Sequence, residues 1–197
     1  MPITERPALW RFEIEVPKFG DEEARTGASW ELPLHTCLAG EGEELLYDGM
    51  SFRFVSPLVV EAEVRWSGEE LLVDVGLNVA LSSSCSRCLE PAGIEIREDF
   101  MYLYSLRKNV KGKKTSEEGE DYRMVTIPCW KSRLDISDQV YESLVLSLPS
   151  RALCSPACRG ICPSCGRRLE SGSCSCSSVE IDPRLEELLA FETDDDT

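Results

Sequence analysis

The sequence predicts an α+β fold, with an antiparallel β-sheet or partly open barrel, one packed amphipathic helix and a C-terminal cysteine-rich zinc segment. Three observations carry this prediction. Long segments of residues 1–150 alternate between apolar and polar residues, as strands with one buried face do. A later segment has apolar residues at helical spacing. Six cysteines then lie between Cys154 and Cys176.

Three neighbouring segments have the period-2 alternation of an antiparallel meander. Leu58–Trp66 places an apolar residue at every second position, and Ser67-Gly68 then supplies a turn. Leu71–Leu81 has the same period, and the alternation resumes between Ile94 and Tyr104. Charged residues occupy many of the alternate positions, so we expect one buried face and one largely acidic, solvated face. Two shorter strand candidates are Trp10–Val16 and Tyr122–Ile127.

A helix is expected at residues 136–148, where apolar residues recur at helical spacing and Pro149 follows the stop. Further on, Asp182 and Pro183 have the features of an N-cap and a first helical residue, which predicts a short helix at Arg184–Phe191. We therefore expect a β core with its helix in residues 1–150, a cysteine-rich segment with a short C-terminal helix in residues 151–192, and an acidic tail in residues 193–197.

The composition is that of an acidic globular protein. The formal net charge is -15 over 197 residues, which is a poor overall match to bare nucleic acid and suits a basic protein partner or simple solubility. No apolar run approaches the roughly 20 residues of a membrane helix, and the N-terminus lacks the features of a secretory signal. We therefore expect a cytoplasmic protein without membrane contact, in which the spacings of the cysteines indicate metal binding rather than disulfides.

The cysteines are spaced as metal ligands. From Cys154 to Cys176 they read C-x3-C-x3-C-x2-C-x8-C-x-C, and Cys85 and Cys88 form a separate C-x2-C upstream. Such short spacings let a backbone present two thiolates to one tetrahedral ion. Gly166 directly follows the C-x2-C pair of the cluster, and its conformational freedom lets the backbone turn there.

Eight of these cysteines make two complete four-cysteine sites. The local site would use Cys162, Cys165, Cys174 and Cys176. The remaining local pair needs distant partners, so the second site would use Cys85, Cys88, Cys154 and Cys158 and would clamp the segment after the helix onto the sheet. Structural Zn²⁺ is the expected ion in both sites, while an iron–sulfur cluster would also use four thiolates. Cys37 and Cys129 are expected to be small buried hydrophobes.

The sequence lacks several parts of a catalytic site. His35 is the sole histidine, so a three-histidine catalytic zinc site is excluded. A closed four-thiolate site has no open position for water or substrate. Glycine patterns of the Walker or dinucleotide-binding kind do not occur. The sequence therefore predicts a protein that is not an enzyme and has no small-molecule substrate.

Several motifs occur together in an order that a generic zinc ribbon lacks. CSRCL occupies residues 85–89, LSLPSRALCSPACRGICPSC occupies residues 146–165, and DPR occupies residues 182–184. In these segments the chain resembles the YceD family, the large ribosomal RNA subunit accumulation proteins of bacteria and plastids. The chain departs from the family at Arg168 and Glu170, where asparagines are usual, and at Ala152, where proline is common.

This resemblance implies a cytosolic, non-enzymatic factor needed for 23S ribosomal RNA to accumulate, and hence for large-subunit assembly. It also indicates a link to a small basic ribosomal protein of the large subunit, whose gene often neighbours those of the family. An RNA contact would use basic side chains that reach phosphates. The candidate RNA-contacting residues are Arg107, Lys108, Lys111, Lys113, Lys114, Arg159, Arg167 and Arg168. The basic run at residues 107–114 is equally typical of a solvated loop.

A second interpretation comes from another class of protein. In it the chain is a redox-responsive zinc protein that releases metal on oxidation and then acts as a holdase for unfolded chains. Zinc release under mild peroxide, together with a gain of holdase activity, distinguishes this interpretation from an assembly factor.

Overall fold

The computed structural model describes residues 6–21, 23–34, 44–106, 122–169 and 174–176. The expected C-terminal helix, the acidic tail, His35, Cys37 and the basic run at residues 107–114 lie outside these ranges. No helix in the described ranges is long and apolar enough to cross a membrane.

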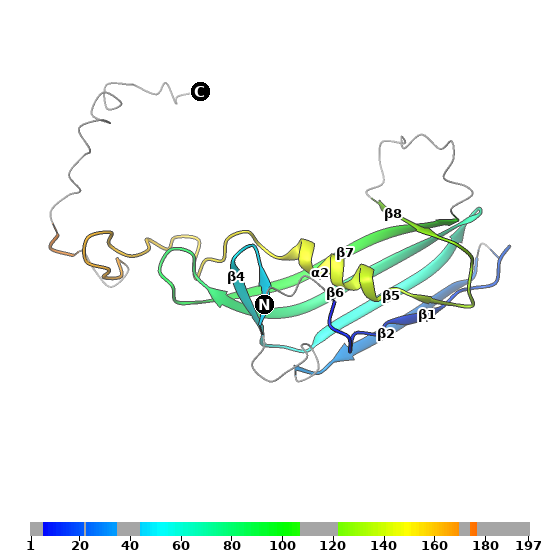
Figure 1. The fold of residues 1–197 in the computed structure, drawn as a ribbon, viewed down its shortest axis with the longest axis horizontal. Helices are drawn as coiled ribbons and strands as arrows, with labels where there is room; N and C mark the ends of the chain where they lie inside the picture. Colours follow the sequence, from blue (N-terminus) through cyan, green and yellow to red (C-terminus); the bar gives the residue numbers. More distant parts are fainter. Residues whose placement is uncertain (1–5, 22, 35–43, 107–121, 170–173, 177–197) are drawn as a thin grey trace, which may run out of the picture.

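A seven-stranded sheet forms the body of the molecule (Figure 1). Its strands are β2 (Arg25–Leu32), β3 (Leu45–Tyr47), β4 (Met50–Phe54), β5 (Leu58–Ser67), β6 (Glu70–Ser84), β7 (Pro91–Leu106) and β8 (Tyr122–Ile127). The expected antiparallel meander is confirmed in β5, β6 and β7. Strand β6 pairs with β5 along its first part and with β4 near its end, while β7 pairs along nearly all of its other edge. The described strands do not close into a barrel.

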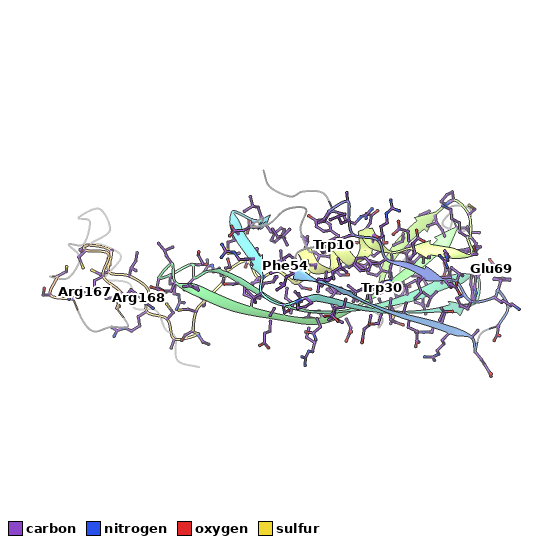
Figure 2. All side chains as sticks on the ribbon, turned by 90° about the horizontal axis from the view of Figure 1, so that it is seen from below. Trp10, Trp30, Phe54, Glu69, Arg167 and Arg168 are labelled. Atoms are coloured by element: carbon purple, nitrogen blue, oxygen red, sulfur yellow. The ribbon has the colours of Figure 1, made fainter. Side chains whose placement is uncertain are left out.

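One face of this sheet is covered by the helix α2 (Ser137–Ser147) and by a small two-stranded ribbon. The ribbon pairs β1 (Glu13–Glu15) with β9 (Arg133–Asp135) in antiparallel register. In Figure 2, α2 and Trp10 lie on the same side of the sheet. No element within the described ranges covers the opposite face, so the fold has one buried and one open face.

The core lies between the covered face and α2, because the period-2 pattern places apolar side chains on one side of every central strand. Val64, Val73 and Tyr102 are in cross-strand register and have no exposed surface. The hydroxyl of Tyr102 hydrogen-bonds the Ser143 Oγ at 2.9 Å and donates to the Gln139 carbonyl at 3.1 Å, which ties β7 to α2.

Strands β2, β3, β4 and β9 were not predicted from the sequence, and three of the predictions that were made differ from the structure. Strand β8 lies where it was expected but runs parallel to β7, so the sheet is mixed at this edge. The expected strand at Trp10–Val16 is reduced to β1, and it pairs outside the main sheet. The prediction that Cys129 is buried is wrong, because this residue lies in the exposed connection between β8 and β9.

A buried serine connects the N-terminal segment to the start of α2. The Ser137 Oγ accepts a hydrogen bond from the Phe12 N–H at 2.8 Å and donates one to the Asp135 Oδ1 at 2.5 Å. The Ile136 N–H also donates to the Phe12 carbonyl at 2.9 Å. Phe12 is fully buried, so its N–H has no access to water if this partner is removed.

We therefore expect Ser137→Ala to lower the free energy of unfolding by about 1–3 kcal/mol, because it leaves a buried N–H without an acceptor. Ser147→Ala is the matched control, since its hydroxyl donates to the Ser143 carbonyl within the same helix and is partly exposed. That substitution should change stability by less than about 0.5 kcal/mol. Urea unfolding of the two variants measures the difference, and equal effects would contradict the role given to Ser137.

Candidate metal centres

Two distant parts of the chain meet at the tip of the β6–β7 hairpin. The sulfur atoms of Cys85 and Cys88, in the hairpin turn, lie within 4.8 Å of those of Cys154 and Cys158, which follow α2. The Cys85 and Cys158 sulfurs are 3.8 Å apart, and those of Cys88 and Cys154 are 3.5 Å apart. A tetrahedral ion with metal–sulfur bonds of about 2.3 Å separates its ligands by about 3.8 Å. The spacing thus fits a single ion and is too long for a disulfide.

Backbone hydrogen bonds fix the Cys85–Cys88 turn. The Cys85 N–H donates to the Glu90 carbonyl at 2.8 Å, and the Leu89 N–H donates to the Cys85 carbonyl at 2.9 Å. This arrangement requires a left-handed conformation at Leu89, whose φ is 65°. A side chain in that conformation costs about 1–2 kcal/mol because its Cβ crowds the following carbonyl.

The segment after α2 docks on this turn through main-chain and side-chain contacts. The Ser86 N–H donates to the Ala152 carbonyl at 2.8 Å, and an Arg87 guanidinium nitrogen donates to the Cys158 carbonyl at 2.7 Å. Gly160 has a φ of 78°, and a Cβ there would lie 3.1 Å from the Arg87 carbonyl oxygen. The hairpin and the segment therefore approach so closely that Gly160 cannot carry a side chain without displacement.

The second cluster lies further along the segment. Its sulfurs, from Cys162, Cys165, Cys174 and Cys176, also lie within 4.8 Å of one another. A small hairpin presents the first pair, with a backbone bridge between Ile161 and Arg168 and a hydrogen bond from the Leu169 N–H to the Gly160 carbonyl at 3.0 Å. Cys165 and Cys176 are exposed, whereas Cys85, Cys88 and Cys158 of the first cluster are buried.

Backbone dipoles favour a thiolate on the first cysteine of each C-x2-C pair. The N–H groups of Cys154, Arg87 and Cys88 lower the pKa of Cys85 to about 6, against the opposing effect of burial. The N–H groups of Cys165 and Ser164 likewise lower the pKa of Cys162 to about 6.

In each cluster, another cysteine has its pKa raised rather than lowered. Burial raises the pKa of Cys158 to about 12, and hydrogen bonding with Cys165 raises the pKa of Cys176 to about 12. Four thiolates at this spacing repel one another, and a divalent cation is the charge that would hold all four ionised.

The predicted RNA-contacting arginines of the cysteine-rich segment lie at one end of the molecule. Figure 2 shows Arg167 and Arg168 at the end opposite to Glu69, beyond the β6–β7 hairpin. Arg159 and Arg167 are exposed, and Arg168 forms an ion pair with Glu90 at 2.9 Å. Sequence reasoning did not assign roles to Arg87, which lies within the C-x2-C motif, or to Glu90, which follows it, although both hold the segment to the hairpin. The predicted basic residues at 107–114 lie outside the described ranges.

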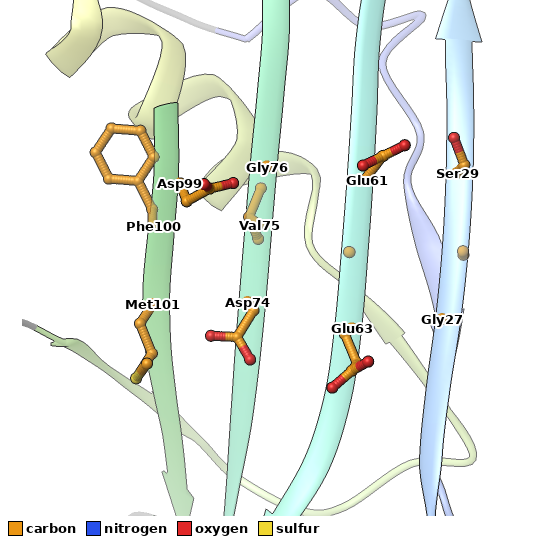
Figure 3. Close-up of a pocket in the computed structure, with 12 residues that line it drawn as sticks. Gly27, Ser29, Glu61, Glu63, Asp74, Val75, Gly76, Asp99, Phe100 and Met101 are labelled. Atoms are coloured by element: carbon orange, nitrogen blue, oxygen red, sulfur yellow. The ribbon is translucent and has the colours of Figure 1, made fainter. Parts of the chain in front are cut away.

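The open face of the sheet carries a shallow hollow of about 860 Å³ over strands β2, β5, β6 and β7. Figure 3 shows Glu61, Glu63, Asp74 and Asp99 around its centre, beside Gly76, which has no side chain. A Cβ at Gly76 would lie 2.9 Å from the Asp99 Oδ1, so the carboxylate of Asp99 occupies the space above the glycine.

Only some of these carboxylates form ion pairs with arginines. Glu63 pairs with Arg25 at 2.9 Å, and Asp74 lies 3.8 Å from Arg65. Among ion pairs between described residues, none involves Glu61 or Asp99. Burial raises the pKa of Asp74 above its ordinary value, with Arg65 opposing the shift. The expected acidic face is thus present. Arg97 lines an adjoining hollow together with Glu61 and Asp99, but neither carboxylate forms an ion pair with a described residue.

Comparisons with known proteins agree with these features. The family model described as "Large ribosomal RNA subunit accumulation protein YceD" matches residues 73–192, the part of the chain with the hairpin, α2 and both cysteine clusters. An uncharacterized protein of Mycobacterium tuberculosis is 29% identical over 98% of this chain and 88% of its own length.

Two plant proteins are also similar. The chloroplastic large ribosomal RNA subunit accumulation protein YCED homolog 1 of Arabidopsis thaliana is 24% identical over 64% of this chain, and that of Zea mays is 25% identical over 61%. The aligned part spans 46% and 49% of these plant proteins. No solved structure matches the chain significantly. Since the family model covers more than half of the sequence, the chain belongs to the YceD family.

Proposed function

We propose that this protein is a non-enzymatic factor of large-subunit biogenesis that supports accumulation of 23S ribosomal RNA in the cytoplasm. Membership of a family described by large ribosomal RNA subunit accumulation carries this proposal, and the names of the plant relatives support it. The two candidate metal centres agree with it, since four-cysteine sites are typically structural and leave no coordination position on the ion for a substrate.

We assign one Zn²⁺ to each four-cysteine cluster. Sulfur–sulfur distances of 3.5 and 3.8 Å support a single ion in the first cluster, because the thiolates of a multi-iron cluster bind different irons. In this proposal residues 1–150 form the β core and residues 151–192 form the zinc-binding segment. The first zinc then joins the two parts, and the second shapes the end of the segment.

Elemental analysis should find two zinc ions per chain. Cys88→Ser and Cys165→Ser should each leave about one, because each removes a ligand from a different cluster. The two variants should then differ in protease sensitivity. Cys88→Ser should release the segment after α2 from the hairpin, whereas Cys165→Ser should leave that junction intact.

A single zinc in the wild-type protein, or an iron content above the zinc content, would contradict this assignment. Equal protease sensitivity of the two variants would contradict the joining role of the first site.

We place the RNA contact at the cysteine-rich end, on the basis of charge distribution. The whole chain has a net charge of -15, yet residues 85–90 and 151–169 contain five arginines against one carboxylate, that of Glu90. The arginines also offset the negative charge of two four-thiolate zinc sites. Arg159 and Arg167 are exposed and form no ion pair between described residues, so they are free to contact phosphates.

The double variant Arg159→Gln/Arg167→Gln should weaken binding to in vitro transcribed 23S ribosomal RNA. It should also reduce the slope of log affinity against log salt by about 1–2, because two phosphate contacts are lost. Arg11→Gln/Arg97→Gln is the matched control, since both arginines are exposed but lie on the β core. Filter binding at several salt concentrations measures the slopes, and equal slopes for both variants would refute this contact.

The open acidic face favours a second contact, with a small basic protein of the large subunit. Glu61 and Asp99 lie at the centre of the hollow and form no ion pair with a described residue, although Arg97 lines an adjoining hollow beside them. Lysine or arginine side chains from a partner would compensate them. RNA phosphates would instead be repelled there.

Purification of the tagged protein from cells should recover a basic large-subunit protein, identified by mass spectrometry. Its recovery should fall several-fold in Glu61→Gln/Asp99→Asn, because the uncompensated charges are removed. The control Glu13→Gln/Glu142→Gln also removes two exposed carboxylates, but from β1 and α2 on the covered side. If recovery of the basic protein fell in both variants, the loss would reflect net charge alone. That outcome would contradict specific binding to the open acidic face.

A further inference from the structure

The two C-x2-C pairs fold into the same turn. In the Cys85–Cys88 pair, the Cys85 N–H donates to the Glu90 carbonyl at 2.8 Å and the Leu89 N–H donates to the Cys85 carbonyl at 2.9 Å. In the other pair, the Cys162 N–H donates to the Arg167 carbonyl at 2.8 Å and the Gly166 N–H donates to the Cys162 carbonyl at 2.9 Å. The chain therefore contains two copies of one local structure with different sequences.

The position after the second cysteine is left-handed in both copies. Gly166 has a φ of 70° and Leu89 has a φ of 65°. Glycine adopts this conformation without strain, whereas a leucine there crowds its own backbone. The second turn thus indicates which residue this backbone position favours, and Leu89 departs from it.

Packing does not explain the leucine. Leu89 is 71% exposed, the largest exposed fraction among the large hydrophobic side chains of the described residues. The buried cluster at this end of the molecule contains Cys85, Cys88, Cys158, Ala92 and Ala152, with Ile94, Leu153 and Cys154 packed against it, and Leu89 is not part of it. A strained residue with a largely exposed side chain gains little from packing, and such outliers concentrate at binding sites.

The surroundings of Leu89 are suited to RNA. The neighbouring Glu90 is neutralised by Arg168, and the neighbouring turn residue Arg87 is exposed, although one of its guanidinium nitrogens donates to the Cys158 carbonyl. Ile161, the backbone partner of Arg168, is also partly exposed. An apolar tip beside arginines matches an unpaired nucleotide, which offers both a base face and a phosphate. A fully paired duplex presents mainly phosphates and 2′-hydroxyls and gives Leu89 no apolar partner.

We propose that Leu89 packs against an unpaired base of RNA, which makes the tip of the β6–β7 hairpin a reader of single-stranded loops. This inference rests on the RNA contact proposed above, and it specifies that the RNA bound there is unpaired. The arginines at the same end of the molecule bind phosphates of both paired and unpaired RNA. Leu89 favours unpaired RNA, because only an unpaired base offers it an apolar surface.

Leu89→Gly tests this inference, because the second turn shows the conformation that glycine adopts there. The variant should keep both metal ions, and its Tm should stay unchanged or rise by about 2–4 °C as strain is relieved. Its affinity for a pool of RNA hairpins with randomised loops should fall at least about fivefold. Its affinity for a fully paired duplex of equal length should change less than twofold. Leu89→Asn, which also tolerates a positive φ, should behave in the same way.

Leu146→Gln is the control, since it removes another exposed leucine from the surface of α2 and should leave both affinities unchanged. Hairpin binding by Leu89→Gly that equals the wild type would overturn the inference and leave the arginine contact standing. An equal loss for hairpins and duplex would also overturn it, as would unchanged RNA binding with loss of a protein partner. A wild-type protein that binds neither RNA would refute the arginine contact and this inference together.

Discussion

The structure depends on one long-range constraint, the meeting of four cysteines from the β6–β7 turn and from the segment after α2. Cys85 and Cys158 are far apart in sequence, yet their sulfurs are 3.8 Å apart. An ion at this point would supplement the few apolar contacts that a short irregular segment can make. Without it, the described part of the segment after α2 would be joined to the hairpin by hydrogen bonds, by the ion pair of Arg168 with Glu90, and by a small buried cluster that includes Ala92 and Ala152. The second cluster builds on this anchor.

The two faces of the sheet have different roles. The covered face holds the core, and the contacts of Tyr102 and Ser137 fix α2 and the N-terminal segment on it. The open face is freed from packing, so it can carry several carboxylates around Gly76. The hairpin tip lies at the end of the same strands. A rigid sheet therefore separates an acidic surface from an arginine-bearing end, which is a suitable arrangement for a factor with contacts of opposite charge.

Much of this could be predicted from the sequence, for identifiable reasons. Period-2 alternation located β5, β6 and β7, and ligand counting grouped the cysteines as the structure brings them together. Strand β2 was missed although its exposure alternates strictly, because its inner positions begin with the small or polar Thr26 and Ala28 and give only a weak apolar signal. The parallel direction of β8 depends on the path of the preceding connection, which local patterning does not encode. The contacts of Arg87 and Glu90 join segments distant in sequence, and no local signal announces them.

The unequal burial of the two clusters has a consequence for how the molecule would lose metal. A chelator or an oxidant reaches the exposed sulfurs of Cys165 and Cys176 before the buried ones of Cys85 and Cys158. Metal loss would therefore proceed from the outer end inward, and a chain that has lost one ion would still be clamped to its sheet. Damage of this kind would be graded and repairable by remetallation, because the inner site would keep the outer ligands close together.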